Sequence, residues 1–329
     1  MVVNIIKKRI IITDDSITHV NIFRTKQISF KDIKGCRVGQ KVIYIVSNTQ
    51  QAPNITITNY IDFADSEELS NWFKENFRDL NAEDYETDLT NVLNDSNLGI
   101  SEDERKAALS QARVIGYSYN IIGIILLVLS FFIKNNVVFE GLLLVYPIIA
   151  VFLIAFGKGL LRLIVNRRSP FFTVFLGIYT TILALFIRSF SFEILNFDHF
   201  WLPFISVTAA FVLGLKLSNP SKTATSIGAS IIWGFLIFGC CYGYVSVRIV
   251  NSLFDNSAPK TFPATVLDHS ISHNKGVHYH IFISEWGPQT KKENIDVSQN
   301  EYYQDTIGST VSVHLKKGVL SIPWYIVSR

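Results

Sequence analysis

The sequence predicts a five-helix membrane bundle flanked by an N-terminal α+β domain and a C-terminal all-β domain. Five long apolar runs lie between Val114 and Val250, and none carries a charged side chain or a histidine near its middle. Lipid selects such runs because every backbone polar group must be satisfied within a helix. Strand-like alternation precedes the runs and returns after them. We therefore expect an N-terminal domain at 1–80, an acidic linker and juxtamembrane helix at 81–113, a transmembrane domain at 114–250 and a β domain at 258–329.

Each apolar run is close to the length that crosses a bilayer. A hydrocarbon core of about 30 Å needs about 20 helical residues. The predicted spans are Val114–Ile133, Val138–Phe156, Phe171–Ile187, Phe200–Leu215 and Ile227–Val247.

Charge in the connections predicts the orientation. The connections after the second and fourth spans are basic, and so is the approach to the first span, whereas the other two connections are not. Basic residues favour the cytoplasmic side. We therefore expect a cytoplasmic N-terminus and a C-terminal domain outside. The second connection supplies the predicted membrane-surface basic residues, Lys158, Arg162, Arg167 and Arg168.

The first domain reads as short strands followed by a helix, because β-branched residues alternate with polar ones between polar turns. The strands are expected at Val2–Thr13, Ile17–Phe23, Gln27–Phe30, Lys41–Ser47 and Asn54–Tyr60. Asp65 is the predicted cap of the helix, with Glu68 completing a capping box. Trp72 lies on the apolar stripe of this helix and is expected in the domain core.

Strands in succession with one terminal helix bearing Trp72 resemble a bacterial-type pleckstrin-homology (PH-like) domain over about residues 1–80. The resemblance implies a binding module without catalytic residues. Lys7, Lys8 and Arg9 alternate along a strand, which favours an exposed edge over a shared pocket; loose contact with anionic headgroups is the alternative. In the linker, Ser101 begins a second capping box, and we expect its helix to run directly into the first span.

The C-terminal domain is predicted as strands at Ala264–Ser272, Val277–Glu285, Ser309–Leu315 and Gly318–Ile322. Residues His273 to Gly276 form the expected hairpin turn. The segments around this hairpin and the ending Gly318–Tyr325 resemble small membrane-anchored β domains of a bacterial family of unknown function. That resemblance implies a bacterial inner-membrane location and transfers no activity.

Histidines gather in this last domain, and histidine is the commonest metal ligand. The weak metal candidates are His278, His280 and His314. The hairpin register places His278 opposite Ser272 and His280 opposite Ser270, with His269 and His273 on the other face. Because three ligands do not share one face, we expect surface or core histidines and no metal or other cofactor; a site closed by His314 is the alternative.

Two features of the membrane segment have more than one interpretation. Aromatic residues crowd the third connection, Arg188 to His199, and its flank; they suit an interfacial anchor or a partner-docking surface. In the fifth span, Gly239 and Gly243 form a Gly-x-x-x-Gly step, and Ser230 and Gly234 another small pair. Such steps let helices approach closely. Packing within the chain is the first interpretation, and a homodimer seam is the second.

The sequence does not predict an activity. It contains no phosphate-binding glycine loop, dinucleotide fingerprint, nucleophile elbow or zinc-protease motif. Residues 1–113 carry net −3, 114–256 net +5 and 257–329 net +1, which argues against nucleic-acid binding. We expect a non-enzymatic binding, scaffold or signal-linking protein whose partners are the bilayer, proteins at either soluble domain, and its own copies in a homo-oligomer. The alternative is a carrier or small channel formed between protomers.

Overall fold

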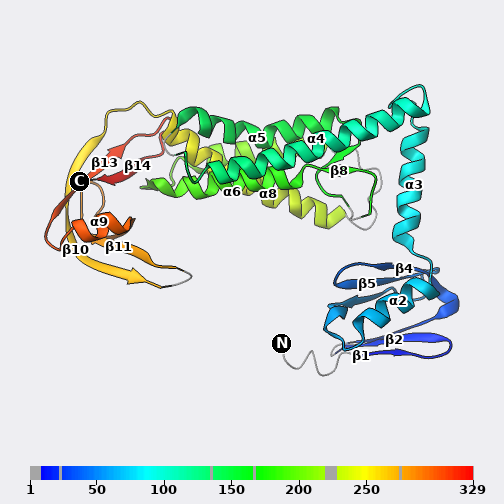
Figure 1. Ribbon diagram of the computed structural model, residues 1–329. Helices are drawn as coiled ribbons and strands as arrows, with labels where there is room; N and C mark the ends of the chain where they lie inside the picture. The colour runs from blue at the N-terminus through cyan, green and yellow to red at the C-terminus, as the bar shows by residue number, and fades with distance from the viewer. Residues whose placement is uncertain are drawn as a thin grey trace. The chain divides into compact units, whose positions relative to one another are not determined.

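The computed structural model describes residues 9–21, 24–133, 136–165, 168–218, 228–273 and 276–328, with side chains 228–232 excepted (Figure 1). The chain forms two compact units. The first comprises Met1–Leu109 with Asn166–Pro170, and the second comprises Ser110–Val165 with Phe171–Arg329. The membrane bundle and the C-terminal domain therefore belong to one unit.

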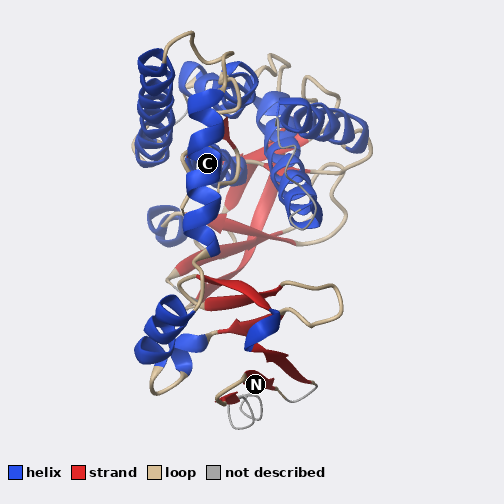
Figure 2. Cartoon of the chain, turned by 90° about the vertical axis from the view of Figure 1, so that its right-hand side faces the viewer, coloured by secondary structure: helices blue, strands red, loops and turns tan. Residues whose placement is uncertain are grey.

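Two three-stranded antiparallel sheets form the first unit (Figure 2). One contains β1 (Arg9–Ile12), β2 (Ser16–Val20) and β3 (Thr25–Ser29), and the other contains β4 (Ile33–Val38), β5 (Val42–Ser47) and β6 (Ile55–Thr58). Short 3₁₀ turns, η1 (Phe30–Asp32) and η2 (Tyr60–Asp62), follow β3 and β6. Alternating isoleucines, including Ile17, Ile43 and Ile57, are fully buried between the sheets and the helix that follows. The strand-rich prediction is confirmed, although β4 was not predicted.

Helix α2 (Ser66–Asn76) begins where the sequence predicts, but the predicted side-chain cap is wrong and the predicted core position of Trp72 is only partly confirmed, since Trp72 packs against the core without being fully buried. Asp65 makes no capping hydrogen bond through its side chain. Trp72 is only half-buried, and the fully buried aromatic of this helix is its neighbour Phe73. The Trp72 ring instead packs edge-on against Phe73 and Phe77 at the rim of the core.

The predicted acidic linker contains a helix, α3 (Leu80–Asn94), which Asp79 caps through Asn81 N. Leu80 and Val92 are the buried residues of α3. Part of the predicted linker is therefore a packed helix. The prediction of a helix that continues into the first span is confirmed. Helix α4 (Glu102–Leu129) is unbroken over 28 residues, and Ser101 Oγ accepts a hydrogen bond from Glu104 N at its start. Glu104 reaches back to Ile100 N.

Five apolar helices follow one another along the chain, and the first of them, α4, enters the second unit at Ser110 (Figure 1). After α4 come α5 (Val137–Phe156), α6 (Phe175–Arg188) with its 3₁₀ extension η3 (Ser189–Ser191), α7 (Trp201–Ser218) and α8 (Gly228–Leu253). Among the described residues, α4, α5, α7 and α8 are long and apolar enough to cross a membrane, and α6 is shorter. Four of the five predicted spans therefore correspond to helices long enough to cross a membrane, and the count of five is not confirmed. Large apolar side chains such as Val128, Phe152 and Leu202 are exposed, which is typical of a lipid-facing surface.

Small residues set the helix spacing. A Cβ on Gly123 would lie 2.6 Å from Gly177 Cα, so α4 and α6 touch backbone to backbone. A Cβ on Gly239 or Gly243 would collide with side chains of α7. The Gly-x-x-x-Gly step is thus used within the chain, as the first interpretation has it, whereas the side chain of Ser230 lies outside the described residues.

Tyrosine hydroxyls add polar contacts between the helices. Near Pro147 in α5, the Tyr119 and Tyr242 hydroxyls donate to the carbonyls of Tyr146 and Leu144. These bonds join α4 and α8 to the carbonyls of α5 on either side of the proline, and in lipid such contacts between helices satisfy polar groups that water cannot reach.

The C-terminal sheet is a half-barrel in the order β12-β11-β10-β13-β14-β9. Its strands are β10 (Lys260–Ser272), β11 (His278–Ile283), β12 (Glu293–Val297), β13 (Thr310–Lys316), β14 (Trp324–Ser328) and β9 (Glu193–Ile194), with helix α9 (Gln299–Gln304) after β12. The predicted hairpin register is confirmed, with Ser270 opposite His280 and Ser272 opposite His278. Neither β12 nor α9 was predicted. The last predicted strand, Gly318–Ile322, is instead a turn in which Gly318 has φ +78°.

The third membrane connection joins the bundle to this half-barrel. Its strand β9 pairs with Trp324 and Tyr325 of β14. Ile322 is fully buried against Phe200 of the connection and Val247 of α8. The aromatics of the connection therefore divide: Phe192 and Phe200 are buried in this junction, whereas Phe190, Phe197 and Trp201 are exposed. The buried aromatics of this segment thus contact the chain's own C-terminal domain, and the exposed ones do not decide between an interfacial anchor and a docking surface.

Candidate binding groove

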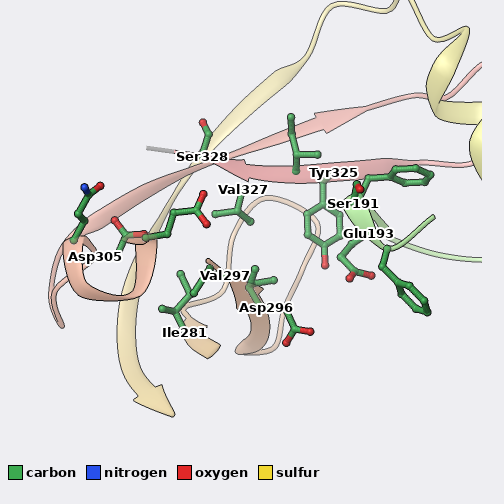
Figure 3. Close-up of a pocket in the computed structure, with 15 residues that line it drawn as sticks. Ser191, Glu193, Ile281, Asp296, Val297, Asp305, Tyr325, Val327 and Ser328 are labelled. Carbon is green, nitrogen blue, oxygen red and sulfur yellow. The ribbon is translucent and has the colours of Figure 1, made fainter. Parts of the chain in front are cut away.

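A groove of about 520 Å³ opens on the inner side of the half-barrel (Figure 3). Strands β9, β11, β12 and β14 and helix α9 supply its walls. The apolar part of the lining includes Ile281, Ile295 and Val327. Four carboxylate residues, Glu193, Asp296, Glu301 and Asp305, also line it, and none of the described lining residues is basic.

The groove exists because the sheet does not close. Four successive antiparallel pairings separate β12 from β14, so these two strands run in the same direction. The short strand β9 covers only Trp324 and Tyr325 of β14. Within the described part of the chain, β12 pairs only with β11, whereas β14 pairs with β13 along its length and with β9 only at Trp324 and Tyr325. The groove thus lies between β12 and β14, which do not pair with each other.

Side chains close one end of this gap. The Tyr325 hydroxyl donates a 2.6 Å hydrogen bond to Glu293 Oε1, which links β14 to β12 across the opening. Gln289 and Trp286 donate to the same carboxylate at 3.1 and 3.2 Å. The pKa of Tyr325 is raised well above its usual range. Burial is the largest cause, and the Glu293 carboxylate is the second. Tyr325 therefore keeps its proton and remains a donor, and Figure 3 shows its ring pointing from β14 into the gap.

Glu193 on β9 lines the groove, and its pKa is raised. Desolvation by the surrounding walls raises its pKa; Arg248 acts in the opposite direction, and Glu293 and Asp296 add to the rise. Among the described residues Glu193 forms no close ion pair. A cation in the groove would therefore stabilise its charged form.

The other carboxylates have structural partners. Asp296 lies on the edge strand β12 and pairs with His280 Nδ1 at 2.5 Å. Glu301 completes a capping box with Ser298 at the start of α9. Asp305 is buried at the end of the same helix.

The half-barrel is fixed to α8 by two polar residues at and just beyond the end of the last span. Asn251 is fully buried, donates to Ile322 O at 2.8 Å and accepts from Leu320 N at 3.0 Å. Asp255 accepts from Gly318 N at 2.9 Å and from Trp324 Nε1 at 2.8 Å. Although desolvation opposes it, the hydrogen bonds from Ser257, Trp324 and Gly318 lower the pKa of Asp255.

Two buried arginines lie in the second unit, Arg188 at the end of α6 and Arg248 in the last turns of α8. Arg188 pairs with Glu140 at 2.5 Å and donates to the carbonyls of Ser130 and Ile133. Arg248 donates to the Tyr244 hydroxyl and to Phe192 O, and its guanidinium lies 5.4 Å from the Phe192 ring centroid. These charges are therefore engaged in helix-end and junction contacts. Neither contact was predicted, because both arginines fall just outside the predicted spans.

The histidine candidates are not brought together. His278 and His280 stack with ring centroids 6.5 Å apart, and His280 Nε2 lies 3.2 Å from Ser272 Oγ. His314 is placed elsewhere, with Nδ1 at 3.0 Å from Thr261 Oγ1 and Nε2 at 2.7 Å from Ser328 Oγ. The His269 ring instead packs against the Tyr302 ring in a tilted arrangement, with centroids 4.7 Å apart. Where the structure describes side chains, no three potential ligands are grouped as a metal site would require.

The basic membrane-surface candidates also have separate contacts. The Arg162 guanidinium lies 3.3 Å from the centroid of the Phe171 ring, beside the short parallel pair β7 (Leu161–Arg162) and β8 (Phe172–Thr173). Arg168 pairs with Asp79 at 2.5 Å inside the first unit. Lys158 has a positive φ of 47°. Arg167, like Lys7 and Lys8, lies outside the described residues, and Arg9 is exposed on β1.

The groove was not predicted, because three of the strands that line it, β9, β12 and β14, were not predicted. Glu293–Val297 alternates polar and apolar residues, which is the signal of a half-buried strand. That alternation would have found β12. The two residues of β9 carry no such signal, because they pair only when distant parts of the chain meet.

No protein-family model, curated protein or solved structure matches this chain.

Proposed function

We propose that this chain is a multi-pass membrane protein that binds a partner through its C-terminal half-barrel and links that binding to the helical bundle. The observation that supports the proposal is the shared sheet: β9 lies between α6 and α7, and it pairs with β14. A displacement of β14 would therefore move β9, and with it the adjoining ends of α6 and α7. Asn251 and Asp255 tie the same strand and the turn before it to α8.

The proposal includes an orientation. Four helices long enough to cross a membrane are compatible with a membrane location. The 14 residues of α6 rise about 21 Å at 1.5 Å per residue, which is short for a bilayer. Local thinning accommodates such a helix at modest cost. With α6 as a fifth span, the N-terminal domain, proposed as PH-like, is cytoplasmic in a bacterial inner membrane and the half-barrel is outside.

Hydrogen exchange of the full chain in lipid nanodiscs tests the linkage. We expect slow exchange at β9 and at residues 318–322, and at least a tenfold acceleration at both in Asn251→Ala, because Asn251 holds the turn through Ile322 and Leu320. Ser252→Ala is the matched control, since its hydroxyl bonds only within α8. Exchange at 318–322 as fast as in an unstructured peptide in the unmodified protein would overturn the proposal.

Transport measurements test the alternative of a carrier or channel between protomers. Proteoliposomes containing the full chain should show no ion flux above protein-free liposomes, because the buried charges of α6 and α8 are engaged in fixed contacts. A saturable flux that disappears on monomer dilution would favour the carrier.

A further inference from the structure

We propose that Ser272, His280 and Asp296 act as a nucleophile, its general base and the carboxylate that orients the base, and that the half-barrel hydrolyses uncharged carboxylic esters at this site. The three residues lie on β10, β11 and β12. This activity is separate from the proposed linkage between the half-barrel and the bundle.

The pairing register of the sheet brings the three side chains to one face. His280 lies directly opposite Asp296 of β12 and opposite Ser270 of β10. Ser272 is two positions from Ser270, so it is the diagonal neighbour of His280 on the same face. The next residue, Ile281, points to the other face and is fully buried in the domain core. Three paired strands therefore hold the polar groups at a fixed spacing.

Two hydrogen bonds join the groups in the order that activation of a serine requires. His280 Nδ1 lies 2.5 Å from Asp296 Oδ1, and His280 Nε2 lies 3.2 Å from Ser272 Oγ. An ionised carboxylate only accepts hydrogen bonds, so Nδ1 is the protonated nitrogen of the neutral ring. Nε2 is then an acceptor, and the Ser272 hydroxyl donates to it. Unrelated folds place a serine nucleophile, its base and a carboxylate in this order.

The two partners of the imidazole differ in exposure. The side chain of His280 is 17% exposed, whereas that of Asp296 is 83% exposed. The covered ring keeps its orientation, but water screens the charge of the carboxylate. Asp296 is therefore a positioning residue, which selects the tautomer of His280. We expect it to contribute less to the rate than His280 does.

A second imidazole lies beside the nucleophile. His278 is directly opposite Ser272, and its ring stacks with the His280 ring at a centroid distance of 6.5 Å. Directly opposed residues have Cβ atoms about 4.5–5.5 Å apart. An N–H of His278 can therefore reach the oxygen of a carbonyl that Ser272 attacks, and such a donor stabilises the negative charge that develops there.

Other residues on the same face indicate the class of ester. Phe282, two residues after His280, is half-buried and offers an apolar contact for the acyl or alcohol group. Asp268, opposite Phe282, is exposed, as is Asp296. Two exposed carboxylates repel an anionic substrate, which favours an uncharged ester.

The reaction needs only water as co-reactant. Ser272 Oγ bonds to the ester carbonyl carbon while its proton moves to His280 Nε2. The bond from that carbon to the alcohol oxygen then breaks, and Nε2 gives the proton to this oxygen, which leaves an acyl group on Ser272. Water attacks the acyl carbon, gives one proton to Nε2 and displaces Oγ. The carboxylic acid departs, and Nε2 returns the proton to Oγ.

Covalent labelling of the full chain in nanodiscs tests for the nucleophile. The probe is an alkyl fluorophosphonate, whose phosphorus bonds to an activated serine oxygen with loss of fluoride. Peptide mass spectrometry should find the phosphonyl group on Ser272. We expect labelling to be at least about a hundredfold slower in His280→Gln, because the general base is missing. Ser270→Ala is the matched control: Ser270 lies on the same strand and face, and labelling should proceed at the unmodified rate.

Ester turnover gives a second readout, with p-nitrophenyl acetate as the substrate. Ser272→Ala should lower the rate by at least about tenfold, whereas Ser270→Ala should leave it unchanged. Both variants keep every histidine, so any hydrolysis by exposed imidazoles is equal in the two. Asp296→Asn should lower kcat by about tenfold and leave KM unchanged, because Asp296 acts on the base and not on the substrate.

Three results would each overturn the proposal: no label on Ser272 in the unmodified protein, an unchanged rate of labelling in His280→Gln, or equal ester turnover in Ser272→Ala and Ser270→Ala. Thermal midpoints check the fold of each variant. A lower midpoint in His280→Gln together with an unlabelled parent would show a purely structural network, which also refutes the activity.

Discussion

Asp255 and Trp324 are 69 positions apart, and the Trp324 indole Nε1 donates a 2.8 Å hydrogen bond to Asp255 Oδ2. Asp255 follows the last membrane helix, and Trp324 begins the strand that receives β9. The Phe192 ring of the third connection packs on Trp324 at a centroid distance of 5.4 Å. One carboxylate thus fixes the indole at which three distant segments meet.

Replacement of Asp255 by alanine should loosen the half-barrel from the bundle. The change leaves Gly318 N and Trp324 Nε1 without their acceptor in a buried environment. We expect a loss of about 2–4 kcal/mol in the free energy of unfolding, from lost charge-assisted bonds and unsatisfied donors. Denaturant unfolding followed by tryptophan fluorescence measures it. Asp268→Ala, an exposed aspartate on β10, is the control and should change stability little.

The same carboxylate predicts a pH dependence. The pKa of Asp255 is lower in the folded protein than its ordinary value of about 3.9, because its hydrogen bonds outweigh desolvation. Its contribution to stability is therefore complete above that value and is lost as pH falls through the lower folded pKa. The difference in thermal midpoint between the unmodified protein and Asp255→Asn should be constant from about pH 7 to about pH 4 and shrink below. A difference that grows on acidification would contradict the assignment.

The buried ion pair between Arg188 and Glu140 should be sensitive to removal of one partner. Both side chains are nearly inaccessible, at 9% and 14% exposure. Glu140→Leu leaves the buried Arg188 guanidinium without its carboxylate partner. We expect the free energy of unfolding to fall by about 3–5 kcal/mol. The double change Glu140→Leu with Arg188→Met should restore much of it. Lys106→Ala breaks an exposed pair with Glu102 and should leave the thermal midpoint unchanged.

Close packing of α7 on α8 should depend on Gly243. An added Cβ would overlap Thr208 Oγ1 and would lie 3.2 Å from Phe204 O, and the second of these atoms is backbone. Gly243→Leu should therefore separate the helices and destabilise the bundle by about 1–3 kcal/mol. Gly141 is the matched control, because nothing lies within 4 Å of the position that a Cβ would take there. Thermal midpoints in detergent should fall for Gly243→Leu and stay level for Gly141→Ala.

Reporter fusions test the orientation. A reporter that works only outside the cytoplasm should be active when joined to the C-terminus at Arg329 and silent when joined after Arg168. The basic second connection predicts the second result, and five crossings predict the first. A silent C-terminal fusion would indicate that α6, the short helix, does not cross.

Elements with a local signal could be predicted from the amino-acid sequence alone. Apolar runs place α4, α5, α7 and α8 to within a few residues, because lipid leaves few alternatives for an uncharged run of that length. Two-residue alternation and a glycine turn predict the register of β10 and β11, including the separation of His278 and His280 from His269. Ser101 marks the start of α4.

The meeting of distant segments, by contrast, became visible only in three dimensions. The two residues of β9 have no periodicity to detect, and they become a strand because Trp324 and Tyr325 lie beside them. Glu193, Tyr325 and Glu293 come from three separate segments, and their grouping follows from the pairing order of the sheet.

Helix α2 shows the same division on a smaller scale. Trp72 and Phe73 both fit its apolar stripe, and packing alone buried Phe73. Local pattern fixes the face and length of an element, whereas the contacts between elements depend on loop closure and side-chain fit, which no local window contains.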